Sequence, residues 1–137
     1  MAQLARSVAT LRIIGDDLVP DVVSKLLGGT PTHSQRKGDA IPLKSGERVA
    51  RCGMWRLAAT DREPEDVDAQ ISEILEKLTP DIESWRSLAG RFRVNLFCGW
   101  FMEEGNEGLS ISPANLVALG ERGIELDLDI YASSDDA

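Results

Sequence analysis

The sequence has few of the side chains that enzymes most often use for chemistry. Its 137 residues include one histidine, His33, and two cysteines, Cys52 and Cys98. The cysteines do not form a C-x-x-C pair, so the usual signature of a zinc site or a thioredoxin-like motif is missing. A Cys–His or Ser–His hydrolase would have to use His33. The composition favours a protein without catalytic residues, metal or cofactor.

Long apolar runs are also lacking. No stretch approaches the roughly 18 apolar residues of a membrane-spanning helix. Arg6 and Arg12 interrupt the apolar residues near the N-terminus, which is not typical of a signal peptide. We therefore expect a cytoplasmic protein without membrane contact. The formal net charge of -8 repels nucleic acids, so we expect no nucleic-acid partner. The length and the 42% hydrophobic content predict one folded domain, residues 1–137.

The hydrophobic periodicity predicts strands and helices in alternation. We predict strands at 6–14, 52–59, 92–101 and 124–133, with weaker strand signals near 32–39 and 108–112. We predict helices at 20–27, 66–78, 79–90 and 113–122. Thr79 and Ser112 are expected caps, each followed by a proline at the first helical position. The order predicts an α+β fold: a ferredoxin-like two-layer sandwich with a mixed, mainly antiparallel sheet and helices packed on one face.

A basic segment precedes the second clear strand. Residues 30–51 show little periodicity, and Pro42 and Gly46 within them indicate an exposed loop or hairpin. Their basic residues are Arg36, Lys37, Lys44, Arg48 and Arg51. Such a segment can hold an anion or a carboxylate-bearing ligand, and we select Arg36 and Lys37 as candidate binding residues. The alternative is that these charges only balance an acidic surface.

Aromatic residues give the second candidate site. Apolar residues occupy both faces of the strand 92–101 from Leu96 onward, which predicts a central strand covered on both sides or exposed at an interface. We select Trp55, Phe97, Trp100 and Phe101 as candidate binding residues, although such residues more often form a core. Cys98 lies among aromatic neighbours, and we expect it to be a core cysteine because apolar burial raises the pKa of a thiol.

Carboxylates give a third candidate. They follow strand ends or lie in the last strand: Asp16, Asp17, Glu103, Glu104, Glu107, Asp127 and Asp129. If they converge, they can hold a divalent cation. No D-x-D-x-D-G calcium loop is present, and a solvated strand face has the same appearance.

Four stretches resemble the uncharacterised, mainly bacterial domain-of-unknown-function 4279 family. They are "ATLRIIGDDLVPDVVSKLLGGTPT", "RKGD", "GMWRL", and "VNLFCGWF" followed by "GNEGLSISPANLVALGERGIELDLDIY". They extend along nearly the whole chain. The resemblance implies no established reaction or ligand.

The function is therefore not given by a motif. Our leading hypothesis is a small non-enzymatic binding module that recognises a protein partner or small ligand around Phe97–Phe101, such as an immunity-type or regulatory adaptor. One alternative is a small metal- or carboxylate-dependent hydrolase. Another is a self-associating structural domain, a homodimer formed through an edge strand at Arg6–Ile14 or Glu125–Tyr131.

Overall fold

The computed structural model describes residues 2–133 and has an α+β fold, as predicted. The strands are β1 (Ala2–Gln3), β2 (Arg6–Gly15), β3 (His33–Gln35), β4 (Ala40–Leu43), β5 (Gly46–Val49), β6 (Gly53–Ala58), β7 (Arg93–Phe101), β8 (Glu107–Gly108) and β9 (Glu125–Tyr131). The helices are α1 (Pro20–Leu27), α2 (Val67–Glu76), α3 (Ile82–Arg91) and α4 (Pro113–Glu121). None of these helices is long and apolar enough to cross a membrane.

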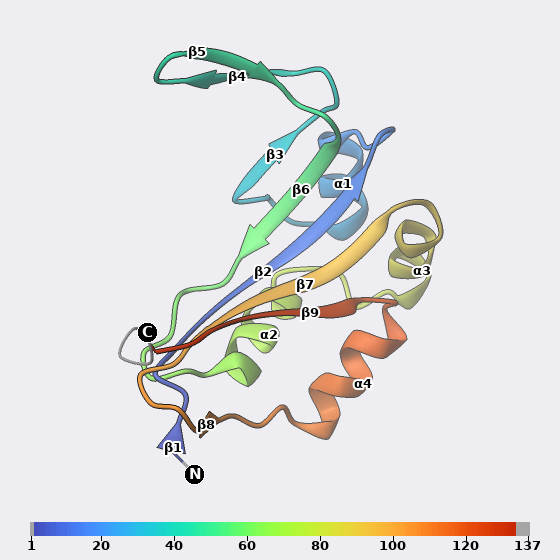
Figure 1. Cartoon of the computed structure of the whole chain (residues 1–137). Coiled ribbons are helices and arrows are strands. Elements are labelled where there is room, and N and C mark those ends of the chain that lie inside the picture. The colour runs from blue at the N-terminus through green and yellow to red at the C-terminus, as the bar shows by residue number, and fades with distance from the viewer. Residues whose placement is uncertain (1, 134–137) are drawn as a thin grey trace.

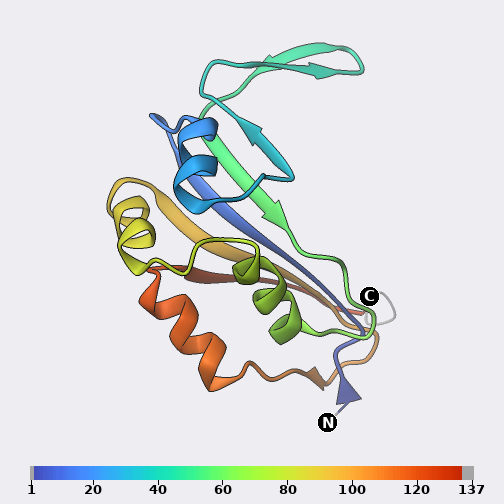
Figure 2. The same ribbon diagram turned by 180° about the vertical axis from the view of Figure 1, so that it is seen from behind.

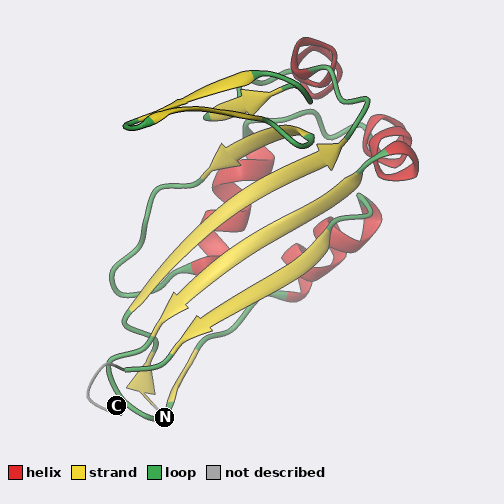
Figure 3. Cartoon of the chain, turned by 45° about the horizontal axis from the view of Figure 1, so that its top comes forward, coloured by secondary structure: helices red, strands yellow, loops and turns green. Residues whose placement is uncertain are grey.

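The main sheet has five strands in the order β3-β6-β2-β7-β9. β2 runs antiparallel to both of its neighbours, and β7 runs parallel to β9. The helices cover one face (Figures 1 and 2) and leave the other face open (Figure 3). The sheet is mixed, as predicted, but its strand pairing does not confirm the ferredoxin-like arrangement.

Strict alternation along the strands separates the two faces of this sheet. Ala9, Leu11 and Ile13 of β2 are at most 1% exposed, whereas the residues between them are half-buried. The predicted inward face of β2 is therefore confirmed. In β6, Trp55 and Leu57 lie on this same helix-covered face, also as predicted. The side chains at alternate positions point to the open face because successive strand residues alternate between the two sides.

Local capping signals fix three of the four helices. Gly28 ends α1 in the left-handed conformation, with φ of 71°. The Asp66 carboxylate accepts a hydrogen bond from the backbone N–H of Ala69 at the start of α2. The Ser112 hydroxyl accepts one from the backbone N–H of Asn115 at the start of α4. The end of α1 before Gly28 and the cap Ser112 were predicted from the sequence, whereas Asp66 was predicted as the first helical residue and is the N-cap.

The start of α3 was predicted two residues too early. The helix begins at Ile82, after the N-cap residue Asp81, and not at Thr79–Pro80. Tertiary contacts occupy the backbone of Thr79 instead: its N–H donates to the carbonyl of Leu27 over 2.7 Å, and its carbonyl accepts from the Trp85 indole over 2.8 Å. These two contacts hold the backbone of Thr79 outside the helix, which begins at Ile82.

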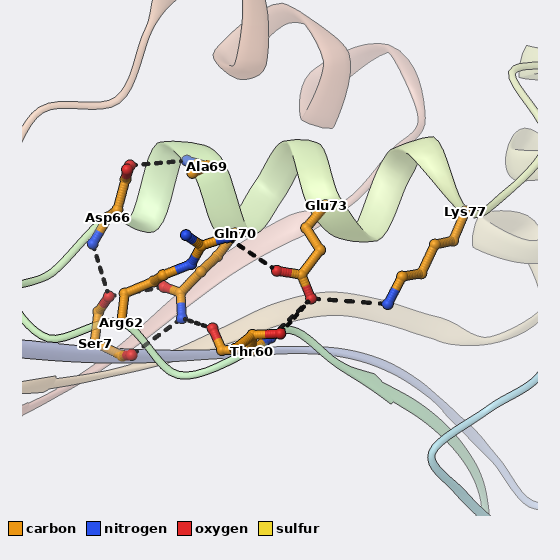
Figure 4. Close-up of polar contacts among 8 residues, drawn as sticks. All are labelled: Ser7, Thr60, Arg62, Asp66, Ala69, Gln70, Glu73 and Lys77. Carbon is orange, nitrogen blue, oxygen red and sulfur yellow. Dashed lines mark hydrogen bonds and ion pairs between the residues drawn. The ribbon is translucent and has the colours of Figure 1, made fainter.

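A buried polar network attaches α2 to the sheet (Figure 4). The side chains of Ser7 and Gln70 are fully buried. The Ser7 hydroxyl donates to Gln70 Oε1 over 2.7 Å, and Gln70 Nε2 donates to the backbone carbonyls of Ser7 and Thr60 over 3.0 and 2.9 Å. The network satisfies the hydrogen-bonding capacity of a buried amide, so it has a structural role.

A second polar contact attaches α4 to α2. The carboxylate of Asp68 accepts hydrogen bonds from the backbone N–H of Ser112 over 2.9 Å and from Asn115 Nδ2 over 2.8 Å. Burial alone would raise the pKa of Asp68, but these hydrogen bonds outweigh it and the net pKa is lowered.

Three expectations about exposure are wrong. Of the two alternatives for β7, coverage on both sides is wrong: among residues 2–133, helices cover only one face of this strand (Figure 3). The alternation of the predicted strand 124–133 leads us to expect Leu128 and Ile130 to be buried; they share the helix side of the sheet with Cys98 and Trp100 but are 44% and 54% exposed, because α4 diverges from β9 (Figure 1). The proposed edge strand Arg6–Ile14 is the central strand β2, whose two edges are both paired.

The basic segment forms a hairpin that projects from the body. β4 and β5 pair only with each other, and their residues are almost all exposed. The hairpin extends past the end of the sheet occupied by β3 and β6 (Figures 1 and 3). The predicted exposed hairpin is thus confirmed, and its position leads to the candidate site.

Candidate ligand-binding face

A row of polar residues crosses the open face of the sheet on all five strands. His33 pairs with Arg56, Arg56 with Arg12, Arg12 with Asn95, and Asn95 with Glu125. Residues paired directly across neighbouring strands lie on the same face. The register therefore brings five residues that are distant in the sequence into one line.

The middle of this row is electrically balanced. Arg12 Nε donates to Asn95 Oδ1 over 2.9 Å, and the Arg12 guanidinium lies 3.7 Å from Asp127 Oδ2 and 4.5 Å from the Phe97 ring centre. Arg93 also pairs with Asp127, over 3.2 Å. Burial lowers the pKa of Arg12, and attraction by Asp127 opposes that shift. These cations have their own counter-ion and need no ligand.

The end of the row next to the hairpin, at His33 and Arg56, borders a pocket. A pocket of about 320 Å³ lies where β4 and β5 meet the open face of β3 and β6. It is lined by His33, Gln35, Ile41, Arg48, Arg51, Cys52, Met54 and Arg56. None of the acidic residues within 2–133 lines it. We call this the first pocket.

Within residues 2–133, the side chains of Arg48, Arg51 and Arg56 form no ion pair and no hydrogen bond with a protein group. Four buried side-chain nitrogens of the described residues have no hydrogen-bond partner, and one of them, Arg56 Nε, belongs to a residue of the first pocket. A buried donor left unsatisfied costs free energy, and guanidinium groups bind carboxylate and phosphate oxygens in paired hydrogen bonds. The first pocket is therefore suited to an anion.

The charge distribution strengthens this interpretation. Residues 33–56 contain six basic and two acidic residues, a formal charge of +4, whereas the rest of the chain contains nine basic and 21 acidic residues. Outside this segment some arginines have acidic partners, as in the pairs Arg6–Asp61 at 2.9 Å and Arg93–Glu125 at 3.1 Å, whereas Arg86, Arg91 and Arg122 form no ion pair within residues 2–133. The distinguishing feature of Arg48, Arg51 and Arg56 is therefore that three arginines without counter-ions line the same pocket.

The opposite end of the open face is aromatic. The rings of Phe101 and Tyr131 stack with centres 4.7 Å apart and an interplanar angle of 3°, and the Arg6 guanidinium lies 4.6 Å from the Phe101 centre. Tyr131 donates a hydrogen bond to Asp129, which raises the pKa of the tyrosine. Half-exposed aromatic and arginine side chains are the residue types that dominate protein interfaces.

The aromatic residues selected from the sequence do not form one site. Trp55 is fully buried on the helix-covered face, where its indole donates to the Ser24 hydroxyl, so it is not accessible to a ligand. Trp100 lies on the same helix-covered side as its strand partner Ser7. Phe97 and Phe101 lie on the open face, since alternate residues of β7 point that way. The reason is parity along the strands, which puts Trp55 and Phe97 on opposite sides of the sheet.

The basic residues selected from the sequence lie at the base of the hairpin. Lys37 lines a second, open pocket of about 720 Å³ together with Gly38, Arg48, Val49, Ala50 and Arg51. Its ammonium group also lies 3.2 Å from Asp16. Arg36 lines neither pocket. Sequence reasoning missed Arg56, although the strict alternation of β6 already puts it on the face opposite to Trp55.

The carboxylates proposed for a hydrolase do not converge. Asp16 and Asp17 follow the last residue of β2, while Glu103–Glu107 follow β7, whose last residue pairs with the first residue of β2. Ten residues of strand separate these ends by roughly 30 Å. The Glu107 carboxylate accepts hydrogen bonds from backbone N–H groups of its own turn. Among residues 2–133, no three His, Cys, Asp or Glu side chains form a metal-binding group.

The single histidine and the buried cysteine also lie apart. Cys98 is fully buried on the helix-covered face, as predicted, and burial raises its pKa to about 12. His33 lies on the open face, next to Arg56. No Cys98–His33 nucleophile and base pair is formed, because the sheet separates the two side chains.

Comparison with known proteins gives one finding. A family model described as a domain of unknown function, DUF4279, matches residues 4–133. The chain belongs to the DUF4279 family. The resemblance inferred from the four sequence stretches is thereby confirmed. Neither the curated proteins nor the solved structures contain a match to this chain.

Proposed function

We propose that this DUF4279 protein is a non-enzymatic binding module that recognises an anionic ligand at the hairpin end of its open sheet face. The observation that carries the proposal is the set of three guanidinium groups around the first pocket, none of which has an acidic partner among the described residues. Each paired guanidinium–oxyanion contact is a charge-assisted hydrogen bond, worth roughly 1.5–3 kcal/mol.

In the unliganded protein, the arginines of the first pocket are in a state of higher free energy that a bound anion would lower. Like charges around one pocket repel each other, and the buried Nε of Arg56 has no acceptor. A bound anion supplies acceptors and counter-charge at the same time. We expect the replacement Arg56→Gln to leave the unliganded protein as stable as before, or more stable, while it weakens anion binding.

The experiment is isothermal titration of the protein with phosphate at low ionic strength. Arg56→Gln is expected to raise Kd roughly tenfold or more, which corresponds to about 1.4 kcal/mol or more. Arg86→Gln is the matched control, because Arg86 is exposed on α3, in the helix layer, and the change in net charge is the same. Equal loss of binding in both variants would show that only the net charge matters and would refute the proposed site.

A second candidate function is docking of a protein partner on the aromatic end of the open face. The stack of Arg6, Phe101 and Tyr131 favours it, because such side chains are frequent hot spots in interfaces. With a purified partner, Phe101→Ala should weaken binding without unfolding the protein. Trp100→Ala is the comparison, since Trp100 faces the helix layer. If both variants lose folding and binding together, Phe101 is a structural residue only.

Self-association through β9 has an electrostatic obstacle. β9 is an edge strand, but a two-fold symmetric antiparallel pairing centred on Leu128 would put Asp127 of one copy opposite Asp129 of the other. Like charges directly opposite each other destabilise a strand pair, and charged residues are a common protection of sheet edges. We therefore favour a monomer. A bacterial source and a cytoplasmic location remain predictions from the sequence.

A further inference from the structure

The first pocket and a neighbouring pocket share two lining residues, and we call the two pockets together the composite site. We call the 720 Å³ pocket lined by Lys37 and Gly38 the second pocket. Arg48 and Arg51 line both pockets. Arg56 belongs to the first pocket alone, and Lys37 to the second alone. Two cationic side chains therefore lie at a shared border, with one further cationic side chain on each side.

Building on the proposed function, we propose that this composite site takes a ligand with two neighbouring anionic groups joined by a short bridge. One group enters the first pocket and contacts Arg56 together with the two border arginines. The other enters the second pocket and contacts Lys37 together with the same two arginines. Diphosphates and short dicarboxylates share this chemistry, since guanidinium groups pair with both phosphate and carboxylate oxygens.

The present partner of Lys37 does not prevent this role. The ammonium group lies 3.2 Å from Asp16, but the two side chains are 54% and 64% exposed. Exposed ion pairs of this kind contribute little to stability, so Lys37 can exchange Asp16 for a ligand at low cost. A ligand with a single anionic group gains one pocket only. A ligand with two groups also binds in the second pocket, and this second contact adds no further loss of translational entropy.

Cys52 provides a local probe of occupancy. It lines the first pocket and is partly exposed, whereas the other cysteine, Cys98, is fully buried. Alkylation by N-ethylmaleimide, which is uncharged and so is not itself attracted to the arginines, should modify Cys52 in the native protein. A ligand in the first pocket should slow this reaction, and mass spectrometry can follow it.

The experiment compares inorganic pyrophosphate, orthophosphate and malonate by calorimetry and by protection of Cys52. Pyrophosphate should bind roughly tenfold tighter than orthophosphate, a difference of about 1.4 kcal/mol. Lys37→Gln should weaken pyrophosphate binding about fivefold while changing orthophosphate binding less than about twofold. Arg56→Gln should weaken both, and Arg86→Gln should change neither. Malonate binding with the same dependence on Lys37 would extend the ligand class to dicarboxylates, and its absence would restrict the class to diphosphates.

The two proposals fail in different ways. If orthophosphate protects Cys52 but pyrophosphate binds no tighter, or if Lys37→Gln has no effect on pyrophosphate, the composite site is refuted and the single anion pocket stands. If no anion binds and none protects Cys52, both proposals are refuted. Circular dichroism would reveal any variant that fails to fold. Lys37→Arg retains the positive charge and should bind pyrophosphate more tightly than Lys37→Gln does.

Discussion

The buried amide of Gln70 allows a quantitative prediction about how the helix layer is held on the sheet. We consider Gln70→Met, which keeps the length of the side chain and removes its three hydrogen bonds, so that the change in volume is small. The substitution leaves the Ser7 hydroxyl and the carbonyls of Ser7 and Thr60 without these partners. Each buried polar group left unsatisfied costs about 1–3 kcal/mol.

The total free-energy cost of these unsatisfied groups is lowered because other partners replace some of the lost hydrogen bonds. The Ser7 carbonyl belongs to a paired strand, and Thr60 lies near the surface, where water can reach its carbonyl. We therefore expect Gln70→Met to lower the free energy of unfolding by about 2–4 kcal/mol, which is a large part of the roughly 5–15 kcal/mol typical of a domain. The assay is urea denaturation followed by circular dichroism and tryptophan fluorescence. The slope of the free energy of unfolding against urea concentration should be the same in the variant and the wild type.

Two further variants make this prediction decisive. Glu76→Met on the exposed side of α2 is the matched control and should change stability by less than about 0.5 kcal/mol. Ser7→Ala combined with Gln70→Met should show a coupling energy of about 0.5–3 kcal/mol, because the two side chains hydrogen-bond directly. A loss below about 1 kcal/mol for Gln70→Met, or additive effects in the double variant, would refute the reasoning.

Three other predictions concern pH, thiol chemistry and association. The pKa of Asp68 is lowered in the folded state, so the ionised carboxylate contributes its full stabilisation above the ordinary carboxyl pKa near 4, and this stabilisation is lost as pH falls below it. Between pH 7 and pH 3, Asp68→Asn should therefore lose less free energy of unfolding than the wild type, as measured by urea denaturation. Burial raises the pKa of Cys98 to about 12, so Ellman's reagent at pH 8 should detect only Cys52 in the native protein and both thiols in urea. Rapid reaction of two thiols without urea would contradict the burial of Cys98. Light scattering should give the mass of a monomer, and a dimer that persists at high protein dilution would show that the acidic residues of β9 do not prevent pairing.

Much of the architecture follows from local patterns in the sequence. The alternation in β2, β6 and β9 and the helical spacing in α2 predicted these elements, because the side-chain periods of strands and helices are properties of the backbone itself. The helix boundaries marked by Gly28 and Ser112 were correct, since a cap needs only its own neighbours in the chain, and the start of α2 was predicted one residue early, at Asp66. The start of α3 was wrong because hydrogen bonds to Leu27 and Trp85 hold Thr79 in place, and no local pattern contains these contacts.

The candidate site was only half visible in the sequence. The basic character of residues 30–51 was apparent, and so were Phe97 and Phe101. Which aromatic residues share a face with the arginines was not, because that depends on the strand order and on the register of the strands. Trp55 belongs to the core for this reason.

The sequence by itself thus determined the type of each element, the caps, the acidic overall charge and the basic hairpin, since these depend on residues that are neighbours in the chain. Only the tertiary structure decided that His33, Arg56 and Arg12 form one row, and that Arg48 and Arg51 meet Arg56 around a pocket without an acid. Register and strand order are set by packing of the whole core, and a shift of one residue would reverse the face of every side chain in a strand.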